Sequence, residues 1–480
     1  MRARISPTCP HRASWNCSAR ASCLPSTCWK RRISQYEHHN GLVNAVTFTH
    51  FDKARAEARE SEDRWRRGEA RPLEGITCAL KDEHHEAGMT ITSGSALLAD
   101  QVKDYTDEVT ALLKDAGVVT HLQTTVPEFY LIGLTHSVHW GVTRNPWNLS
   151  FTVGGSSGGS GAALAAGMTT LATGSDMGGS VRLPSAFCGL YGFKPPYGRV
   201  STELPLEQYA GTGPLARTFA DLVRFQNAMA GPTTYAPMTL PKQTLPLDYD
   251  GVNGLRIAYS PDLGLLPVSV DTREVAGAAA LRLQELGAEV TGIELDLGTS
   301  MDDLADMFFR AFWAGSMGGA LEQLSDHTEA MSPYAAAIFD MLKTSRYGGA
   351  DNAAFELWMR RLYTRLVDQV WNRGYDVLVT PTLADSHVPA DFDPSLHSFS
   401  IDGVPAHPQF TAALTAPWNI LNSHPVISVP AGRTGRGMPV GLQIITAPYA
   451  DELAFRVAHA YELATEPLFT AGARPDYRSA

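Results

Sequence analysis

The alternation of apolar and polar positions along the chain predicts helices and strands in turn. A polar helix is expected over residues 51–67, ended by Gly68, and an amphipathic helix over 107–116, ended by Gly117. Near residues 254–296 the pattern predicts a strand–helix–strand unit in which Gly287 ends the helix. Strands that alternate with helices are typical of layered α/β folds, and we predict that class here.

The opening of the chain differs in character from the rest. Residues 1–30 hold four of the six cysteines, are rich in Arg, Ser and Pro, and no acidic residue precedes Glu37. Organelle transit peptides show this bias, and so does translation from a wrong start or frame. We favour the second interpretation because residues 1–30 show no helical or strand periodicity. We expect residues 1–30 to be a disordered or non-native extension, and residues 31–480 to form the domain.

Charge and composition narrow the classes of partner. The formal net charge of −11 disfavours binding to a nucleic-acid backbone, which requires basic surfaces. No apolar run approaches the roughly 20 residues of a membrane-spanning helix, and the N-terminus lacks the apolar core of a secretory signal. We therefore expect a cytoplasmic protein with neither a nucleic-acid nor a membrane partner.

Two Gly/Ser-rich segments carry the strongest chemical signal. They are Gly154–Gly161 and Gly174–Arg182. Loops of this composition are commonly turns or linkers. Here, however, glycine pairs directly precede serines, and glycine tolerates the positive φ that lets backbone N–H groups converge. Converging N–H groups can form an oxyanion hole, in which one donor contributes about 2.7–4 kcal/mol to transition-state stabilisation.

A serine in these loops would need a base from elsewhere, because neither loop contains histidine. Lys81 ends an apolar run, Ile76–Leu80, that predicts a buried strand. Lysine accepts a proton only in its neutral form, which burial favours. Strand alternation should turn Asp82 to the opposite face. Taken singly, Lys81 would be an ordinary solvated lysine, and the serines ordinary turn residues.

Together and in this order, the segments resemble the amidase-signature family. The resemblance runs from about residue 32 to about residue 470 and includes residues 72–82, 154–166, 174–199, 376–382 and 418–443. It implies a single large α/β domain with a central mixed β-sheet flanked by helices on both sides. It also implies an amidase that forms an acyl-enzyme with a small-molecule amide, transfers the acyl group to water, and needs no cofactor.

The resemblance assigns a role to each matching residue. Ser180 would be the nucleophile, Ser156 the bridging serine usually held by a cis peptide bond, and Lys81 the base. Asp176 and Arg182 match the pair that shapes the nucleophile loop. The oxyanion hole would consist of the backbone N–H groups of Met177, Gly178, Gly179 and Ser180. A lysine base predicts an alkaline pH optimum.

Two segments depart from the family pattern. After Lys81 and Asp82 the chain continues with Glu83–Glu86, and residues 121–127 also differ from those of many relatives. We expect neither change to touch the catalytic residues, and both to bear on substrate choice. His84 and His85 do not have the His-Glu-x-x-His spacing of a metalloprotease, so we predict no metal. Candidate substrate-binding residues are Tyr130, Leu131, Ser157, Phe312 and Trp313.

Three alternatives stay open from the sequence. Glutamine-hydrolysing subunits of tRNA amidotransferases share the signature, although Tyr209–Pro214 stands where they usually carry another motif. Gly155–Gly159 fits the Gly-x-Ser-x-Gly elbow of Ser-His-Asp α/β-hydrolases, although Asn145–Asn148 interrupts the strand that should precede it. A non-catalytic phosphate or nucleotide binder would use the glycine loops, but they lack the Gly-Lys-Ser/Thr ending of a P-loop.

The choice of substrate also stays open. The family resemblance covers enzymes acting on aliphatic, aryl and fatty amides, with esters or carbamates as further substrates. We expect a small, apolar or aryl carboxamide. A homodimer is the commonest closed assembly for such a protein.

Overall fold

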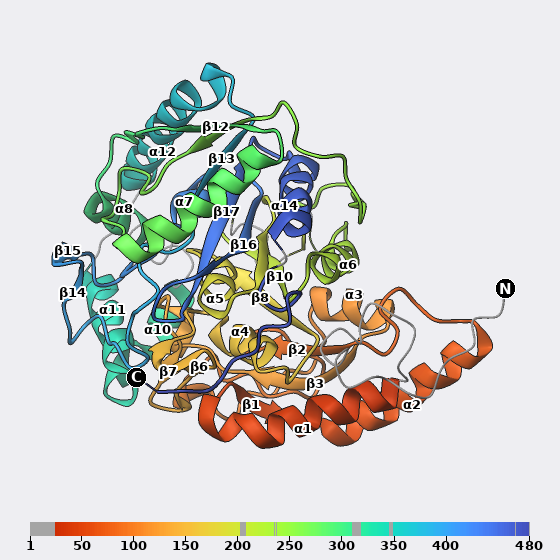
Figure 1. Ribbon diagram of the computed structural model, residues 1–480. Helices are drawn as coiled ribbons and strands as arrows, with labels where there is room; N and C mark the ends of the chain where they lie inside the picture. Colours follow the sequence, from red (N-terminus) through yellow and green to blue (C-terminus); the bar gives the residue numbers. More distant parts are fainter. Residues whose placement is uncertain are drawn as a thin grey trace.

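The computed structural model describes residues 25–201, 208–234, 236, 238–309, 318–344, 349–465 and 467–479. At its centre lies one mixed sheet of 11 strands (Figure 1). In spatial order the strands are β1 (Val46–Thr49), β3 (Val119–Thr124), β2 (Thr77–Lys81), β8 (Leu171–Asp176), β10 (Gly211–Ala216), β9 (Tyr191–Lys194), β16 (Val426–Arg433), β17 (Pro439–Thr446), β13 (Val377–Pro381), β11 (Arg256–Tyr259) and β12 (Glu289–Gly292). The predicted α/β class and mixed sheet are confirmed.

Three short two-stranded sheets lie outside the central one: β4 (His136–Ser137) with β5 (Gly141–Val142), β6 (Arg144–Asn145) with β7 (Asn148–Thr152), and β14 (Phe399–Ile401) with β15 (Val404–Ala406). The α-helices are α1 (Pro25–Val43), α2 (Phe51–Arg67), α3 (Glu108–Ala116), α4 (Gly158–Ala165), α5 (Arg182–Cys188), α6 (Phe219–Met229), α7 (Val270–Glu285), α8 (Met301–Phe308), α10 (Gly318–Leu324), α11 (Pro333–Thr344), α12 (Gly349–Gln369), α13 (Pro417–Ile420) and α14 (Asp451–Thr465). Within the described ranges, no helix is both long and apolar enough to cross a membrane.

Helices cover both faces of the central sheet, so inner strands such as β2 and β17 are buried on both sides. In β16, Ile427 and Val429 belong to a core shared with α6, α7 and α14. The alternate residue Val426 belongs to a second core, which contains Leu183 and Phe187 of α5 and residues of α8 and α11. Successive strand side chains point to opposite faces, so one apolar strand supplies both cores.

Glycines end the helices where the sequence pattern places them. Gly68 follows α2 with φ of 75°, and Gly117 follows α3 with φ of 100°. Glycine adopts positive φ without the steric cost that a Cβ atom imposes. The predicted strand–helix–strand unit is β11, α7 and β12, with β11 and β12 parallel and Gly287 at φ of 94° just after the helix. These predictions are confirmed.

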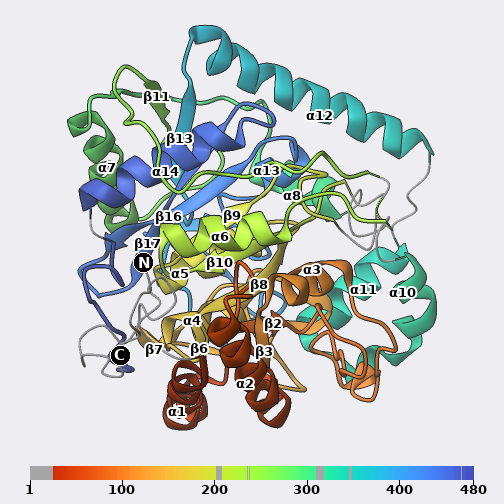
Figure 2. The same cartoon turned by 90° about the vertical axis from the view of Figure 1, so that its right-hand side faces the viewer.

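The N-terminal boundary differs from the prediction. Helix α1 begins at Pro25, Trp29 is buried, and the Arg32 guanidinium donates to Gly167 O at 3.1 Å. Residues 25–30 are thus part of α1, whereas the sequence pattern placed them in the extension. The remainder of the predicted extension, residues 1–24, lies outside the described residues. Helices α1 and α2 lie side by side at one end of the molecule, and α12 lies at the other (Figures 1 and 2).

Candidate active site

Two neighbouring parallel strands bring the key segments together. Strands β2 and β8 pair in parallel, with Cys78 opposite Leu171. Lys81 is the last residue of β2 and Asp176 is the last of β8. The carboxyl ends of parallel strands are where α/β folds commonly bind ligands. The Gly/Ser loops lie beside this edge, one between β7 and α4 and the other between β8 and α5.

The Lys81 amine lies in a cluster of hydroxyl groups. Its Nζ atom is 2.8 Å from Ser156 Oγ and 2.6 Å from Ser175 Oγ, and its side chain is fully buried. The ring of Tyr130 covers Nζ, with the ring centroid 4.9 Å away. A neutral amine at this distance can take the proton of Ser156, and an ammonium can return it.

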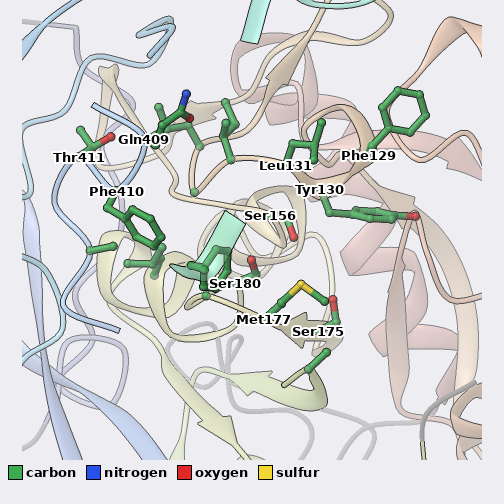
Figure 3. A pocket seen from close by; sticks show the side chains of 18 of the residues that line it. Phe129, Tyr130, Leu131, Ser156, Ser175, Met177, Ser180, Gln409, Phe410 and Thr411 are labelled. Atoms are coloured by element: carbon green, nitrogen blue, oxygen red, sulfur yellow. The ribbon is translucent and has the colours of Figure 1, made fainter. Parts of the chain in front are cut away.

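Ser156 and Ser180 come from different loops and line one pocket. The Gly155–Ser156 peptide bond is cis. The backbone N–H of Ser157 donates to Ser180 O at 3.2 Å, which joins the two loops. Figure 3 shows the Ser156 and Ser180 hydroxyl groups facing the same part of the pocket. The structure thus brings Lys81, Ser156 and Ser180 to one place.

The backbone preceding Ser180 is held by Asp176. The Gly179 N–H donates to Asp176 Oδ1 at 2.8 Å, so this predicted oxyanion donor is already engaged. Across the described part of the chain, the N–H groups of Met177, Gly178 and Ser180 donate to no protein acceptor. Gly179 has φ of 130°, and a Cβ atom there would lie 2.1 Å from Thr415 Oγ1, so the turn requires glycine.

Arg182 and Asp176 form the buried support of this loop. Arg182 Nη2 donates to Asp176 Oδ1 at 2.8 Å, and Nε donates to Oδ2 at 2.9 Å. The guanidinium also donates to Thr415 O, Gln443 Oε1 and Asn419 Oδ1, so all five of its donors are used. Burial opposes ionisation of Asp176, but Arg182 and Asn419 outweigh it and lower the pKa of that carboxyl to about 2.

The pocket above the serines is mostly apolar (Figure 3). Its wall includes the predicted residues Tyr130 and Leu131. Ser157 is fully buried outside this wall, so its predicted contact with substrate is not found. The predicted Phe312 and Trp313 lie outside the described residues. Other apolar residues of the wall include Phe129, Ile132, Leu134, Met177, Leu183, Phe187, Phe308, Phe309 and Phe410.

Sequence reasoning missed Glu83 and Ser175. Glu83 Oε2 lies 2.8 Å from Lys81 Nζ and accepts a hydrogen bond of 2.7 Å from Ser175 Oγ. The expectation that residues 83–86 leave the lysine untouched is therefore wrong for Glu83. A turn after β2, with the His84 N–H donating to Lys81 O at 2.8 Å, folds Glu83 back onto the strand end. The departure from the family pattern at residue 83 was the available signal.

The other charged residues after Lys81 point elsewhere. Asp82 accepts from the Thr92 N–H at 3.2 Å and is not among the described residues that line the pocket. Burial raises the pKa of Asp82 to about 6. His84 and His85 lie near Asp107, with His84 Nδ1 3.6 Å from Asp107 Oδ1. Within the residues that the structure describes, no three His, Cys, Asp or Glu side chains are grouped to hold a metal ion.

Comparison with known proteins identifies the family. The family model described as Amidase matches residues 30–455. The chain belongs to the amidase family. An acylamidase of Rhodococcus erythropolis is 32% identical over 447 residues, which cover 91% of each chain. A glutamyl-tRNA(Gln) amidotransferase subunit of Synechococcus sp. (strain CC9605) is 31% identical over 471 residues, covering 91% of this chain and 92% of the relative.

Solved structures of amidase-family proteins share the fold. A bacterial aryl acylamidase of the amidase-signature family superposes with a TM-score of 0.84 at 28% identity, covering 92% of this chain and 93% of that one. A 6-aminohexanoate cyclic dimer hydrolase bound to substrate superposes with a TM-score of 0.82 at 25% identity, covering 94% and 95%. The protein is an amide-hydrolysing enzyme of this family.

Family membership also decides against two of the alternatives. An α/β-hydrolase elbow would expose Ser157 as the nucleophile, but Ser157 is buried and its Oγ faces Ser175 O at 3.4 Å. A non-catalytic nucleotide binder does not fit a chain that matches the Amidase family model and an acylamidase. Family membership does not decide against the glutamine-hydrolysing alternative, because such subunits belong to the same family.

Proposed function

We propose that the protein is an acylamidase that cleaves apolar or aryl carboxamides through an acyl-enzyme on Ser180. The observation that carries the proposal is the hydrogen bond between Lys81 Nζ and Ser156 Oγ beneath a pocket lined by both serines. A bridging serine can carry a proton from a nucleophilic serine to a lysine amine, and later carry it back toward the leaving group.

The reaction follows from this arrangement. Neutral Lys81 takes the proton of Ser156 as Ser156 takes that of Ser180, and Ser180 Oγ attacks the amide carbon. The N–H groups of Met177, Gly178 and Ser180 stabilise the oxyanion, each contributing about 2.7–4 kcal/mol. The proton then returns through Ser156 to the leaving amine as the C–N bond breaks. Water then gives a proton through Ser156 to Lys81 and attacks the acyl carbon. The bond between the acyl carbon and Ser180 Oγ breaks, the proton returns to Ser180, and the carboxylic acid is released.

The pocket wall supports an apolar acyl or aryl group. Aromatic side chains from distant segments, among them Phe129, Phe308 and Phe410, surround the serines. Two of the relatives are an acylamidase and an aryl acylamidase by name. Esters and carbamates of similar shape would react at the same carbonyl position, and we propose them as secondary substrates.

Glutamine is a poorer fit to the pocket. Its α-carboxylate calls for a cationic side chain, and the described lining residues include neither lysine nor arginine. Glu83 is the only carboxylate or basic side chain among these described lining residues. Several relatives are glutamyl-tRNA(Gln) amidotransferase subunits, so glutamine has to be tested as a substrate.

A substrate panel separates the two functions. The purified protein would be offered acetanilide, a longer-chain anilide, benzamide and glutamine, with release of aniline or ammonia measured at several concentrations. We expect kcat/KM for the anilides to exceed that for glutamine at least tenfold. Efficient ammonia release from glutamine, with no aniline released from the anilides, would overturn the acylamidase assignment in favour of a glutaminase.

A further inference from the structure

Glu83 touches the base but is not itself placed in the proton path. Its Oε2 atom, Lys81 Nζ and Ser175 Oγ form a closed triangle with sides of 2.8, 2.7 and 2.6 Å. About a third of the Glu83 side chain is exposed, and Glu83 lines the same pocket as Ser156 and Ser180. A carboxylate in direct contact with the base constrains the orientation of its amine.

We propose that Glu83 is a positioning residue that orients the Lys81 amine toward Ser156. This inference rests on the proposed function, because it takes Lys81 to be the base. It concerns one carboxylate that stands where the family pattern usually has another residue.

The orienting role follows from counting donors. An ammonium has three N–H donors, and Lys81 Nζ has three oxygen neighbours, in Ser156, Ser175 and Glu83. A neutral amine has two N–H donors and one lone pair. With Glu83 and Ser175 receiving the two donors, the lone pair is directed at Ser156 Oγ. This is the orientation in which Lys81 can accept the Ser156 proton.

The charge of Glu83 strengthens this contact. A carboxylate 2.8 Å from Nζ accepts a charge-assisted hydrogen bond from the amine, which is stronger than a bond to a neutral acceptor. Burial opposes ionisation of Glu83, but Lys81, His84 and Ser175 outweigh it, so the pKa of Glu83 is lowered and its carboxylate is charged at neutral pH.

The remaining groups around this pair have other partners. Asp82 is turned to Thr92, and His84 faces Asp107 as well as Glu83. From the neighbouring segments, Tyr130 presents its ring face to Nζ and donates its hydroxyl to Asp82 O at 2.9 Å, and Ser156 and Ser175 are neutral. Glu83 is therefore the anion in ion-pair contact with Lys81 among the described residues.

The test is the split between kcat and KM for an anilide in wild type, Glu83→Gln and Glu83→Ala. The Gln variant removes the charge but keeps an acceptor, and the Ala variant removes both. We expect kcat to fall by about 100-fold in Glu83→Ala with little change in KM, because the amine loses its orientation. We expect Glu83→Gln to recover most of this loss, because its amide oxygen can still accept from Lys81.

Glu86→Gln is the matched control. Glu86 lies three residues further along and pairs with Lys53 rather than with the pocket, so its variant should keep the wild-type kcat. If turnover of a Glu83 variant is too slow, the rate of fluorophosphonate labelling of Ser180 gives the same comparison. A wild-type kcat in Glu83→Ala, or a Glu83→Gln variant as slow as Glu83→Ala, would overturn the inference while leaving the proposed function intact. Failure of the proposed function would instead show in wild type, as absence of labelling at Ser180.

Discussion

Asp176 and Arg182 form a two-point ion pair with both side chains fully buried, at 2.8 and 2.9 Å. Through Arg182 this pair reaches Asn419 and Gln443, more than 200 residues away in the chain. Through the Gly179 N–H it fixes the turn that carries Ser180. The resemblance of the C-terminal segments to the family thus has a structural reason, because they supply acceptors that hold the nucleophile loop.

Removing one partner of this pair should destabilise the whole fold. Arg182→Ala leaves a buried carboxylate without a counter-ion, and we expect the free energy of unfolding to fall by about 3–5 kcal/mol. Chemical denaturation monitored by circular dichroism measures the change. A loss below about 1 kcal/mol would show that the pair does not anchor the loop.

Acid should weaken the protein partly through Asp107. Burial disfavours its ionisation, but His84 and Thr110 outweigh this and lower its pKa to about 2. A carboxyl whose folded-state pKa is depressed stabilises the fold above its unfolded pKa of roughly 3.9, and that stability is lost as pH falls through the folded value. The contribution should be about 2 kcal/mol at pH 5 and about half of that at pH 3.

Asp107→Asn isolates this charge, since asparagine can still accept the Thr110 N–H as the N-cap of α3. Urea unfolding of wild type and variant at pH 5 and pH 3 gives the two differences. The difference in unfolding free energy between wild type and Asp107→Asn should be smaller at pH 3 than at pH 5. A gap that is equal at both values, or wider at pH 3, would contradict the assigned charge state.

Gly179→Ala should abolish most activity. Its Cβ atom would fall 2.1 Å from Thr415 Oγ1 at a φ of 130°, which alanine rarely adopts, so the turn before Ser180 must shift. We expect kcat to fall by about 100-fold or more, as for loss of an oxyanion donor. Gly178→Ala is the milder comparison, since its Cβ would meet only the Phe308 ring, at 3.1 Å. Equal activity in both variants would argue against this account of the turn.

Lys81→Met tests the base with limited disturbance of the core. The lysine side chain is fully buried, and methionine is an unbranched apolar side chain of similar length. We expect kcat for an anilide to fall by about 10²–10⁴-fold, the range of general acid–base catalysis. Thermal unfolding would check that the variant is folded. A folded variant with more than a tenth of wild-type kcat would rule out Lys81 as the base.

Local sequence patterns predicted much of the fold, because helix ends and buried strands depend mainly on neighbouring residues. Gly68 and Gly117 end helices at positive φ, and the apolar run before Lys81 forms a strand buried on both faces. The difference at residues 25–30 has a tertiary reason. The helix from Pro25 is polar and weakly periodic, but Trp29 and Arg32 are buried against distant parts of the chain.

The same distinction between local and tertiary causes applies to the residues of the candidate site. Lys81, Ser156 and Ser180 could be predicted because they stand in segments that resemble a known family. Glu83 and Ser175 could not, since their contact with Lys81 depends on a turn after β2 and on the pairing of β2 with β8. The part of the pocket wall that Phe410 forms was missed, because Phe410 meets Phe308 from a segment about 100 residues away in the chain.

The most direct measurement of the central claim is covalent labelling with a small fluorophosphonate followed by peptide mass spectrometry. We predict a single adduct at Ser180 in wild type, no adduct there in Ser180→Ala, and labelling slowed at least 100-fold in Lys81→Met. An adduct at Ser157 or another serine, with Ser180 unmodified in folded and active enzyme, would contradict the assignment of the nucleophile.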